Sequence, residues 1–297
     1  MCGIAGFVND MPIDVKCPVL QRMTDMIAHR GPDSEGHYID EHAALGHRRL
    51  SIIDLGGGQQ PIYNEDGSKV ITFNGEIYNY QTLREELIAA GHTFTTKSDT
   101  EVLLHGYEQW GVDLLQRVRG MFTFVIWDKN KQELFGARDH FGIKPFYYAK
   151  MNGTFMYASE IKSLLRHPDF VKELNAEALK PYMTFQYPAI GETFFKGVYK
   201  LPEGHYFTYR DGKMDIHRYY DEDFREGKQK LGELVNSIDQ TVCDSVKAHQ
   251  IADVEVGSFL SSGVDSSYVA AVARPQHTYS IGFGKGTYNE SQQAGEL

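Results

Sequence analysis

The chain of 297 residues is 41% hydrophobic and 24% charged, and its 30 Lys and Arg against 40 Asp and Glu give a formal charge of −10. This acidic balance argues against nucleic acid and anionic membranes as partners, because both carry negative charge. No apolar run approaches the about 18 residues of a membrane helix, the N-terminus lacks a signal-peptide pattern, and three widely spaced cysteines suggest no disulfide framework. The length predicts roughly two domains of about 150 residues, and the whole pattern predicts a cytoplasmic protein.

The first predicted element is a buried strand over residues 3–8, directly after a cysteine at position 2. If Met1 is removed, the free α-amine of Cys2, with a pKa of about 7.7–8, can act as the base for its own thiol. The strand would then fix this nucleophile in the body of a domain. The same residues are also consistent with an ordinary cysteine, because so short a motif often matches by chance.

A helix is predicted over residues 15–28, and the turn His29-Arg30-Gly31-Pro32-Asp33 follows it. Pro32 favours an extended or turn conformation at Gly31, so Arg30 and Asp33 are presented by a rigid turn. An ordinary loop with a charge pair explains this segment equally well. Strands are expected next over residues 36–39, 43–46 and 48–53, before a break at residues 56–58.

The strand predicted over residues 69–73 leads into Asn74-Gly75-Glu76. An Asn-Gly pair after a strand is usually a turn, but a side-chain amide beside an unhindered glycine N–H is also a suitable donor pair for an oxyanion. A helix is expected over residues 80–90, and the capping-box pattern Ser98-Asp99-Thr100-Glu101 begins another. The dipole of that helix would stabilise the charge of Asp99 by about 0.3–1 kcal/mol.

From residue 121 the pattern is typical of strands, over 121–128, 133–139, 145–150 and 154–159, with short helices near 160–165 and 176–183 and a hairpin of 205–209 and 213–217. The twelve histidines do not show the close, repeated spacing with carboxylates or thiols that is typical of metal sites. The nearest pair of note, His42 and His47, is expected in surface or core roles. The sequence therefore predicts no metal-ligating set.

Residues 219–230 are polar and acidic without periodicity, and they are the candidate linker. Beyond them the sequence predicts a helix over 231–246, a buried strand over 254–260, a helix over 265–273, a strand over 278–283 and a helix over 289–297. This order is typical of the start of a parallel α/β sheet. The turn over residues 261–267, Ser-Ser-Gly-Val-Asp-Ser-Ser, would form a phosphate cradle at a helix N-terminus, without the Gly-Lys of the Walker loop.

The chain resembles the glutamine-hydrolysing asparagine synthetases, which are class II, N-terminal-nucleophile glutamine amidotransferases. The resemblance rests on a series of motifs in the same order: CGIAGF, HRGPD, RRLSIID, FNGEIYN, SDTE, RDHFGIKPFYY, ASEIKSLL, LPEGH and LSSGVDSS. It implies an α+β domain followed by α/β structure: an αββα N-terminal-nucleophile hydrolase sandwich over residues 2–218, the linker 219–230, and the first part of a Rossmann-like ATP-pyrophosphatase domain over 231–297. The opening cysteine is shared with relatives that make phosphoribosylamine and glucosamine phosphate, whereas the SGVDSS loop selects the synthetase branch.

The resemblance also implies roles for individual residues. Cys2 matches the nucleophile that attacks the side-chain amide of glutamine, with Asn74 and the Gly75 N–H as the oxyanion hole. Asp99, with Glu76 close by, matches the partner of the α-ammonium of glutamine, and Arg30 is expected to support the site without touching substrate. The α-carboxylate of glutamine is expected to bind Arg49, helped by the backbone of Leu50, Ser51, Ile52 and Ile53.

In the second domain, Leu260 and Ile281 match positions that contact adenine. The pyrophosphate of ATP is expected to bind Ser261, Gly263, Asp265 and Ser266, with Mg²⁺ alongside. The family reaction activates the β-carboxylate of aspartate as an acyl-adenylate, which ammonia from an internal tunnel then attacks. The expected partners are therefore glutamine, aspartate and ATP, and a homodimer is one candidate assembly.

Two departures from the family pattern affect the second domain. Ser262 stands where the family loop has its first glycine, which would cost about 1–2 kcal/mol if that residue needs φ > 0. Family members continue for roughly as many residues again, so the synthetase domain is expected to be incomplete, and the chain is expected to hydrolyse glutamine without making asparagine. A relative that amidates another carboxylate, such as a cell-envelope or antibiotic precursor, and a non-catalytic glutamine-binding module remain as alternatives.

Overall fold

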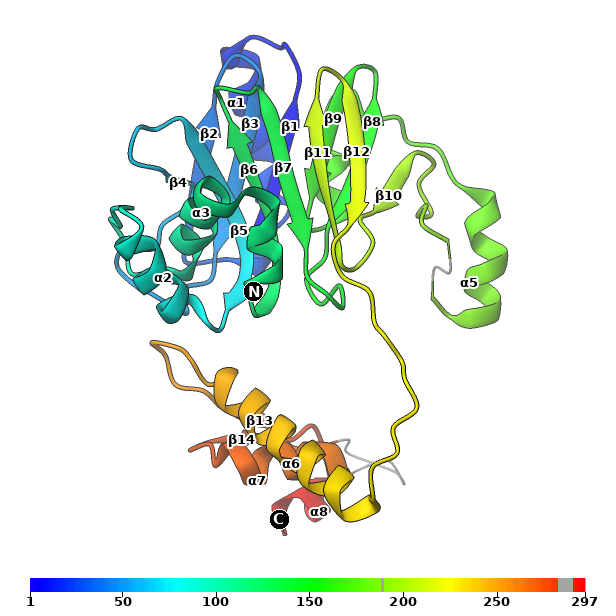
Figure 1. Ribbon diagram of the computed structural model, residues 1–297. Coiled ribbons are helices and arrows are strands. Elements are labelled where there is room, and N and C mark those ends of the chain that lie inside the picture. The colour runs from blue at the N-terminus through cyan, green and yellow to red at the C-terminus, as the bar shows by residue number, and fades with distance from the viewer. Residues whose placement is uncertain (188–189, 283–290, 297) are drawn as a thin grey trace. The chain divides into compact units, whose positions relative to one another are not determined.

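The computed structural model describes residues 1–187, 190–282 and 291–296 (Figure 1). The chain divides into two compact units, Met1–Glu222 and Asp223–Leu297, and each unit is described by itself. The division falls inside the predicted linker 219–230. Within the first unit, the Tyr219 N–H donates to the Gly204 carbonyl at 2.8 Å, so the first residues of that segment are bonded to the domain that precedes them.

Two six-stranded antiparallel sheets form the first unit. The first sheet has the order β10-β8-β9-β1-β3-β2 and the second has the order β12-β11-β7-β6-β5-β4. The strands of the first sheet are β1 (Gly3–Val8), β2 (Ser34–Ile39), β3 (Ala43–Arg49), β8 (Tyr147–Met151), β9 (Thr154–Ala158) and β10 (Val198–Lys200). Those of the second are β4 (Ile62–Tyr63), β5 (Lys69–Ile77), β6 (Gly120–Asp128), β7 (Glu133–Arg138), β11 (His205–Arg210) and β12 (Lys213–Arg218).

The helices of this unit are α1 (Ile13–Asp25), α2 (Tyr80–Ala89), α3 (Asp99–Trp110), α4 (Ile161–Leu164) and α5 (Leu179–Phe185), with the short 3₁₀ helices η1 (Ala28–Arg30), η2 (Gly111–Gln116) and η3 (Ala176–Ala178). Helices cover the outer faces of the two sheets, α1 and α4 on the first and α2 and α3 on the second, whereas α5 extends to the side of the sheets (Figure 1). Three clusters of buried apolar side chains separate the layers: one between α1 and the first sheet, one between the sheets, and one between the second sheet and α2 and α3. The unit is therefore a four-layer αββα sandwich.

Strand periodicity explains how β6 contributes to two of these clusters. Phe122, Phe124 and Ile126 face the helices, whereas Val125 and Trp127 face the other sheet. Alternate residues of a strand point to opposite faces, so an apolar run that is buried on both faces fits the middle of a sandwich. The run MFTFVIWD predicted this strand for the same reason.

Several predicted boundaries are wrong, and two of these errors change the site. The two strands predicted over 43–46 and 48–53 are one strand, β3, which ends at Arg49, so residues 50–53 leave the sheet as a loop. The strand predicted over 69–73 continues to Ile77, and Asn74 and Gly75 pair with Thr123 and Phe122 of β6. Asn74-Gly75 is therefore sheet and not a turn. Strands β4 and β10 were not predicted.

The N-terminal cap of α3 is half confirmed. Ser98 Oγ accepts a hydrogen bond from the Thr100 N–H at 3.2 Å, as a cap should. The second half of the capping box is wrong, because Glu101 does not return to Ser98. Its carboxylate instead accepts hydrogen bonds from the backbone N–H groups of Thr95 and Thr96, at 2.7 Å each.

The second unit contains α6 (Leu231–Ala248), β13 (Ser258–Phe259), α7 (Val264–Ala273), β14 (Thr278–Tyr279) and α8 (Ser291–Gly295). Strands β13 and β14 pair in parallel, which confirms the predicted start of a parallel α/β unit. The buried strand predicted over 254–260 is wrong, since β13 has two residues and Phe259 is 77% exposed. Parts of the strand predicted over 278–283 and of the helix predicted over 289–297 lie outside the described residues. No helix in the described part of the chain is long and apolar enough to span a membrane.

Candidate active site

A cavity of about 310 Å³ in the first unit lies where β1, β3 and β5 meet the start of α3. The chain brings to it Cys2, Arg49, Asn74, Gly75 and Asp99, which come from four separate segments. Four other predicted site residues also line it: Leu50, Ile52, Ile53 and Glu76. Ser51 does not line the cavity.

Cys2 is held by the backbone of the segment that follows β3. The Leu50 N–H donates to Cys2 Sγ at 3.3 Å, and the thiol faces the Leu50 carbonyl at 3.5 Å. Burial raises the pKa of the Cys2 thiol, although the Leu50 N–H opposes the shift. The α-amine at this point of the structure belongs to Met1, and burial lowers its pKa. A thiol with a raised pKa needs a base beside it to act as a nucleophile near neutral pH.

The turn over residues 29–33 holds the backbone of Cys2 in position. Arg30 Nε donates to the Cys2 carbonyl at 2.9 Å, and Arg30 Nη1 pairs with Glu160 at 3.1 Å. A side chain at Gly31 would collide with the backbone of Arg48, because its Cβ would lie 2.3 Å from the Arg48 carbonyl. The close approach of this turn to β3 therefore requires glycine.

The same turn holds the segment that follows Arg49. The Asp33 N–H donates to the Arg49 carbonyl at 3.0 Å, and Asp33 Oδ2 accepts from the Ser51 N–H at 2.8 Å. Ser51 thus faces the turn and not the cavity. The two residues that the sequence placed on a rigid turn, Arg30 and Asp33, have complementary tasks: one anchors the cysteine and the other anchors the loop of Arg49.

Arg49 is 6% exposed and lies at the end of β3. Its Nη2 donates to the carbonyls of Ile53 and Asp54, at 3.1 and 2.6 Å, and Nη1 faces the Leu55 carbonyl at 3.5 Å. These bonds use three of the five N–H groups of a guanidinium and hold its plane in place. Among the described residues, Nε and the second N–H of Nη1 have no partner of this kind and remain for a ligand.

Asp99 is a buried carboxyl group in the first turn of α3. Its Oδ2 accepts from the Ile77 N–H at 3.0 Å, and its Oδ1 accepts from Ser98 Oγ at 3.4 Å. Burial, reinforced by the charge of Glu76, raises the pKa of Asp99 to about 7 in spite of these bonds. A ligand cation bound beside Asp99 would restore its ionised form.

Asn74 and Gly75 lie on β5 beside the cysteine. Asn74 is 1% exposed, and its Nδ2 has no hydrogen-bond partner among the described residues. A buried N–H without a partner costs about 1–3 kcal/mol, so its retention at a cavity wall indicates a ligand acceptor. Gly75 has a packing reason as well, since a Cβ there would lie 2.2 Å from the Met121 carbonyl.

The cavity also contains residues to which the sequence assigned no role. Lys144, in the motif RDHFGIKPFYY, is 4% exposed and lines the wall, and burial lowers its pKa. Gln60 links two other walls, because its Oε1 accepts from the Phe73 N–H at 2.6 Å and its Nε2 donates to Thr100 Oγ1 at 3.2 Å. A lysine is rarely buried unless it is paired or has a function, so the burial of Lys144 marks it as a candidate site residue. The sequence could not identify it, because a pattern of residues does not show whether one particular side chain is buried.

In the second unit, the segment over residues 261–267 follows β13, and its residues from Val264 onward form the first turn of α7. Its hydroxyls bond to the segment itself: Ser261 Oγ and Ser266 Oγ are 2.8 Å apart, and Ser267 Oγ donates to the Gly263 carbonyl at 2.7 Å. Ser262 does not have a positive φ, so the cost considered for a left-handed residue does not arise. Leu260 is buried, whereas Ile281 is 71% exposed.

Comparison with known proteins gives consistent matches along the chain. Residues 1–220 match the family model described as glutamine amidotransferase domain, and residues 237–297 match the model described as asparagine synthase. The chain is 44% identical over 304 residues to asparagine synthetase [glutamine-hydrolyzing] 1 of Bacillus subtilis, covering 100% of this chain and 48% of that protein. It is 35% identical over 295 residues to amidase chry2 of Gibberella zeae, covering 92% of this chain and 42% of that protein.

Among solved structures, the chain is similar to a glutamine phosphoribosylpyrophosphate amidotransferase from Bacillus subtilis, with a TM-score of 0.56 and 17% sequence identity. That match covers 97% of this chain and 67% of the other. It confirms the predicted fold class, the αββα sandwich. The chain spans about half the length of the curated relatives it matches.

Proposed function

The chain belongs to the glutamine amidotransferase domain family, and from this premise we propose that Met1–Glu222 hydrolyses glutamine to glutamate and ammonia with Cys2 as the nucleophile. The observation that carries the proposal is the composition of one cavity. The cavity brings together the half-buried thiol of Cys2, an amide N–H that has no partner among the described residues, a guanidinium and a carboxyl group of raised pKa.

The proposed chemistry begins with removal of Met1, which frees the amine of Cys2 as a base next to the thiol. The amine takes the thiol proton while sulfur attacks the carboxamide carbon of glutamine, and the new C–S bond places negative charge on oxygen. Asn74 Nδ2 and the Gly75 N–H would stabilise that oxygen. The C–N bond then breaks as the amine returns its proton to the leaving ammonia, and water cleaves the thioester to release glutamate and the free thiol.

Charge complementarity supports glutamine as the substrate. Arg49 brings a positive charge to the cavity wall, which suits a carboxylate. No cation from the described residues is among the causes that set the pKa of Asp99, and the α-ammonium of an amino acid would supply one. A ligand with both charges on one carbon therefore fits the two ends of the cavity, and its side-chain amide extends towards Cys2.

We further propose that Asp223–Leu297 contributes to ATP binding for the amidation of aspartate to asparagine through an acyl-adenylate. The support is the match of residues 237–297 to the asparagine synthase model and the place of the loop over 261–267. This loop lies at the carboxyl end of β13 and the N-terminus of α7, which is where parallel α/β sheets bind phosphates. Leu260 and Ile281 follow the ends of β13 and β14, a place that suits adenine.

Mg²⁺ would neutralise phosphate charge in this reaction. The carboxylate of Asp265 is an oxygen ligand of the kind that Mg²⁺ takes, and the hydroxyls of Ser261 and Ser266 could donate hydrogen bonds to the phosphates. The domain limits 2–218, 219–230 and 231–297, a homodimeric assembly and a cytoplasmic location belong to the same proposal. All three cysteines are free, which agrees with a reducing compartment.

An amidotransferase for another carboxylate is the second candidate function. It is favoured by the likeness to amidase chry2, whose name states no amino-acid acceptor. Both candidates share the glutaminase step, so the acceptor must be tested separately by supplying ATP, Mg²⁺ and ammonia with aspartate or with other carboxylates.

Release of glutamate from glutamine tests the core of the proposal. The purified chain, with loss of Met1 established by intact mass, should release glutamate, and Cys2→Ala should not. A Cys2→Ala protein that retains activity near that of the parent would contradict the assignment, as would a parent protein that binds glutamine without hydrolysing it. The second result would identify the chain as a glutamine-binding module.

A further inference from the structure

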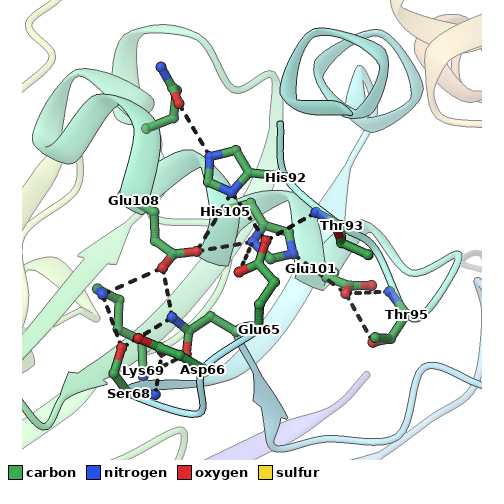
Figure 2. A network of polar contacts seen from close by, with 12 residues as sticks. Glu65, Asp66, Ser68, Lys69, His92, Thr93, Thr95, Glu101, His105 and Glu108 are labelled. Carbon is green, nitrogen blue, oxygen red and sulfur yellow. Dashed lines mark hydrogen bonds and ion pairs between the residues drawn. The ribbon is translucent and has the colours of Figure 1, made fainter. Parts of the chain in front are cut away.

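Two histidines and two glutamates gather on the first unit, away from the cavity that contains Cys2. Glu65, His92, His105 and Glu108 each offer one possible ligand atom, and these atoms all lie within 4.8 Å of one another (Figure 2). They come from three segments: the turn between β4 and β5, the segment between α2 and α3, and α3 itself. Spacing along the sequence could not reveal this set, because only His105 and Glu108 are close neighbours in the chain.

Four contacts between the histidine nitrogens and the carboxylate oxygens are close to the edge lengths of a tetrahedral metal site, and Glu65 makes its two contacts through different oxygens. His105 Nδ1 lies 3.0 Å from Glu108 Oε2 and 3.5 Å from Glu65 Oε2. His92 Nδ1 lies 3.5 Å from Glu65 Oε1 and 3.9 Å from Glu108 Oε2. Bonds of about 2.0–2.1 Å to a tetrahedral zinc ion place neighbouring ligand atoms about 3.3 Å apart. Small side-chain movements would therefore complete the geometry.

The far nitrogen of each histidine lies near an oxygen, the arrangement that orients histidine ligands in protein metal sites. His92 Nε2 is within hydrogen-bond distance of Gln109 Oε1, at 3.2 Å, whereas His105 Nε2 makes an ion-pair contact with Glu101 Oε1 at 3.5 Å and has no hydrogen-bond partner among the described residues. Glu101 is itself held by four hydrogen bonds from the backbone and side chains of Thr95 and Thr96. A proton on each Nε2 leaves the Nδ1 lone pair of each ring pointing at the two carboxylates.

The two carboxylates are also held in place by outer contacts. Glu108 Oε1 accepts from Asn64 Nδ2 at 2.7 Å and faces Lys69 Nζ at 3.5 Å, so Oε2 is the oxygen that faces the histidines. Glu65 Oε1 accepts from the Thr93 N–H at 3.0 Å. Figure 2 shows the four candidate ligands together with Lys69, Thr93, Thr95 and Glu101.

We propose that Glu65, His92, His105 and Glu108 bind one Zn²⁺ ion that stabilises the first unit. Two imidazoles and two carboxylates form a neutral complex with a divalent cation, and a mixed nitrogen and oxygen set of four suits zinc better than Mg²⁺ or Ca²⁺, which prefer oxygen ligands. The ion would join the β4–β5 turn and the α2–α3 segment to α3. Because Asp99 begins α3, the site would steady the wall of the cavity without taking part in its chemistry.

A network of ion pairs without metal is the competing explanation. Burial would lower the pKa of His105, but its contacts with Glu101 and Glu108 raise it to about 9, so a second proton on this ring can take the place of the cation. Zinc must displace that proton. Both states use the same residues, and direct measurement of bound metal separates them.

The experiment uses the whole chain with Cys2→Ala, so that the N-terminal thiol does not bind zinc. After treatment with a chelator, the protein is titrated with Zn²⁺ against a chromophoric competitor, bound zinc is counted by elemental analysis, and thermal unfolding is followed with and without zinc. His92→Gln and Glu65→Gln are the test variants, since both side chains come from connecting segments and keep some exposure. His42→Gln is the matched control, because His42 pairs with Asp10 outside the cluster.

The parent and the His42→Gln protein should bind one equivalent of zinc and unfold several degrees higher with it. Each test variant should bind zinc at least tenfold more weakly and lose that rise in Tm, while its circular dichroism spectrum stays unchanged. A parent protein that binds no stoichiometric zinc would overturn the proposal in favour of the ion-pair network, as would test variants that bind zinc as tightly as the parent. Titration with Mg²⁺ should give no comparable rise in Tm.

Discussion

The two units differ in how completely each one buries its apolar residues. In Met1–Glu222, three clusters of fully buried side chains separate four layers. In Asp223–Leu297, the buried apolar residues among those described are Leu260 and Ala294. The apolar face of α6 is largely open, with Leu231, Val235 and Ile238 between 55% and 78% exposed. Helices with a clear apolar face in the sequence thus bury that face in the first unit, whereas α6 of the second unit leaves its apolar face largely exposed.

The same difference extends to the polar groups of the two candidate sites. The cavity of the first unit keeps a buried amide N–H without a partner at Asn74, which is possible only because packed strands hold it in place. The loop over residues 261–267 satisfies its own hydroxyls, and its side chains are exposed or half-exposed. A donor held in place without a partner, like the Asn74 amide, is suited to catalysis. The hydroxyls of residues 261–267 would first have to break their internal hydrogen bonds before they could bind a ligand.

The strongest test of this contrast removes the nucleophile from the pre-organised site. Cys2→Ala should lower glutamine hydrolysis by about 10⁴-fold or more, because the covalent step is lost, and it should leave thermal unfolding nearly unchanged. Glutamate release is the measurement. Cys17→Ala provides the control, since this cysteine is exposed and free. Equal losses in both variants would show that the loss is not specific to Cys2 and would contradict its assignment as the nucleophile.

The contrast in burial can be tested with two matched leucines on helices. Leu20→Ala on α1 removes a side chain that is 0% exposed and should cost about 2–5 kcal/mol in the free energy of unfolding. Leu231→Ala on α6 changes a side chain that is 78% exposed and should change stability by no more than about 0.5 kcal/mol. Both tryptophans, Trp110 and Trp127, lie in the first unit, so their fluorescence reports its unfolding selectively.

Hydrogen exchange provides the corresponding measurement for α6. Its amides should exchange much faster than those of α1 in the same protein, because few buried contacts oppose local opening. A large cost for Leu231→Ala, or protection of α6 equal to that of α1, would show that the second unit has a core of its own.

The layers of the first unit were predicted through the family resemblance, whereas its individual strands and helices were predicted from local signals. The apolar runs of β1 and β6 and the cap at Ser98 each depend on a few neighbouring residues. The candidate site was found through motifs, and the structure brings Cys2 and Asp99 to one cavity. What escaped prediction depends on contacts between distant segments: the end of β3 at Arg49, the extension of β5 past Gly75, and the burial of Lys144.

The buried strand predicted over residues 254–260 was wrong because a clear local pattern was not matched by packing partners from distant segments. Its local pattern is clear, but burial needs layers on both faces, and the described residues of the second unit do not supply them. The histidine cluster was missed because spacing was the only signal considered. His92 and His105 lie on opposite sides of the α3 N-terminus in sequence and meet only after α2 and α3 pack.

A smaller effect tests whether glycine at position 75 serves packing as well as the site. Gly75→Ala would place a Cβ 2.2 Å from the Met121 carbonyl, so β5 and β6 must separate locally, at a cost of about 1–3 kcal/mol. Gly56→Ala meets nothing within 4 Å and should leave stability nearly unchanged. Denaturant unfolding of both variants gives the comparison. Equal stabilities would show that the sandwich adapts at β5 and that glycine is kept there for catalysis alone.

The smallest expected effect concerns the ionisation of Asp99, a property that only the well-packed unit can produce. Burial and the nearby Glu76 raise the pKa of Asp99 to about 7, so the free protein holds a proton there below that pH and loses it above. A ligand ammonium favours the ionised carboxylate, so binding must release the proton at low pH. Glutamine affinity should therefore rise by about tenfold from pH 6 to pH 8 and level off above, as the ionised fraction does. Calorimetric titration of the Cys2→Ala protein, which cannot turn over its ligand, measures this directly, and Asp99→Asn should weaken binding and abolish its pH dependence. A pH dependence that persists in Asp99→Asn would assign the proton to another group of the cavity, such as Glu76, and would remove Asp99 as the partner of the ammonium.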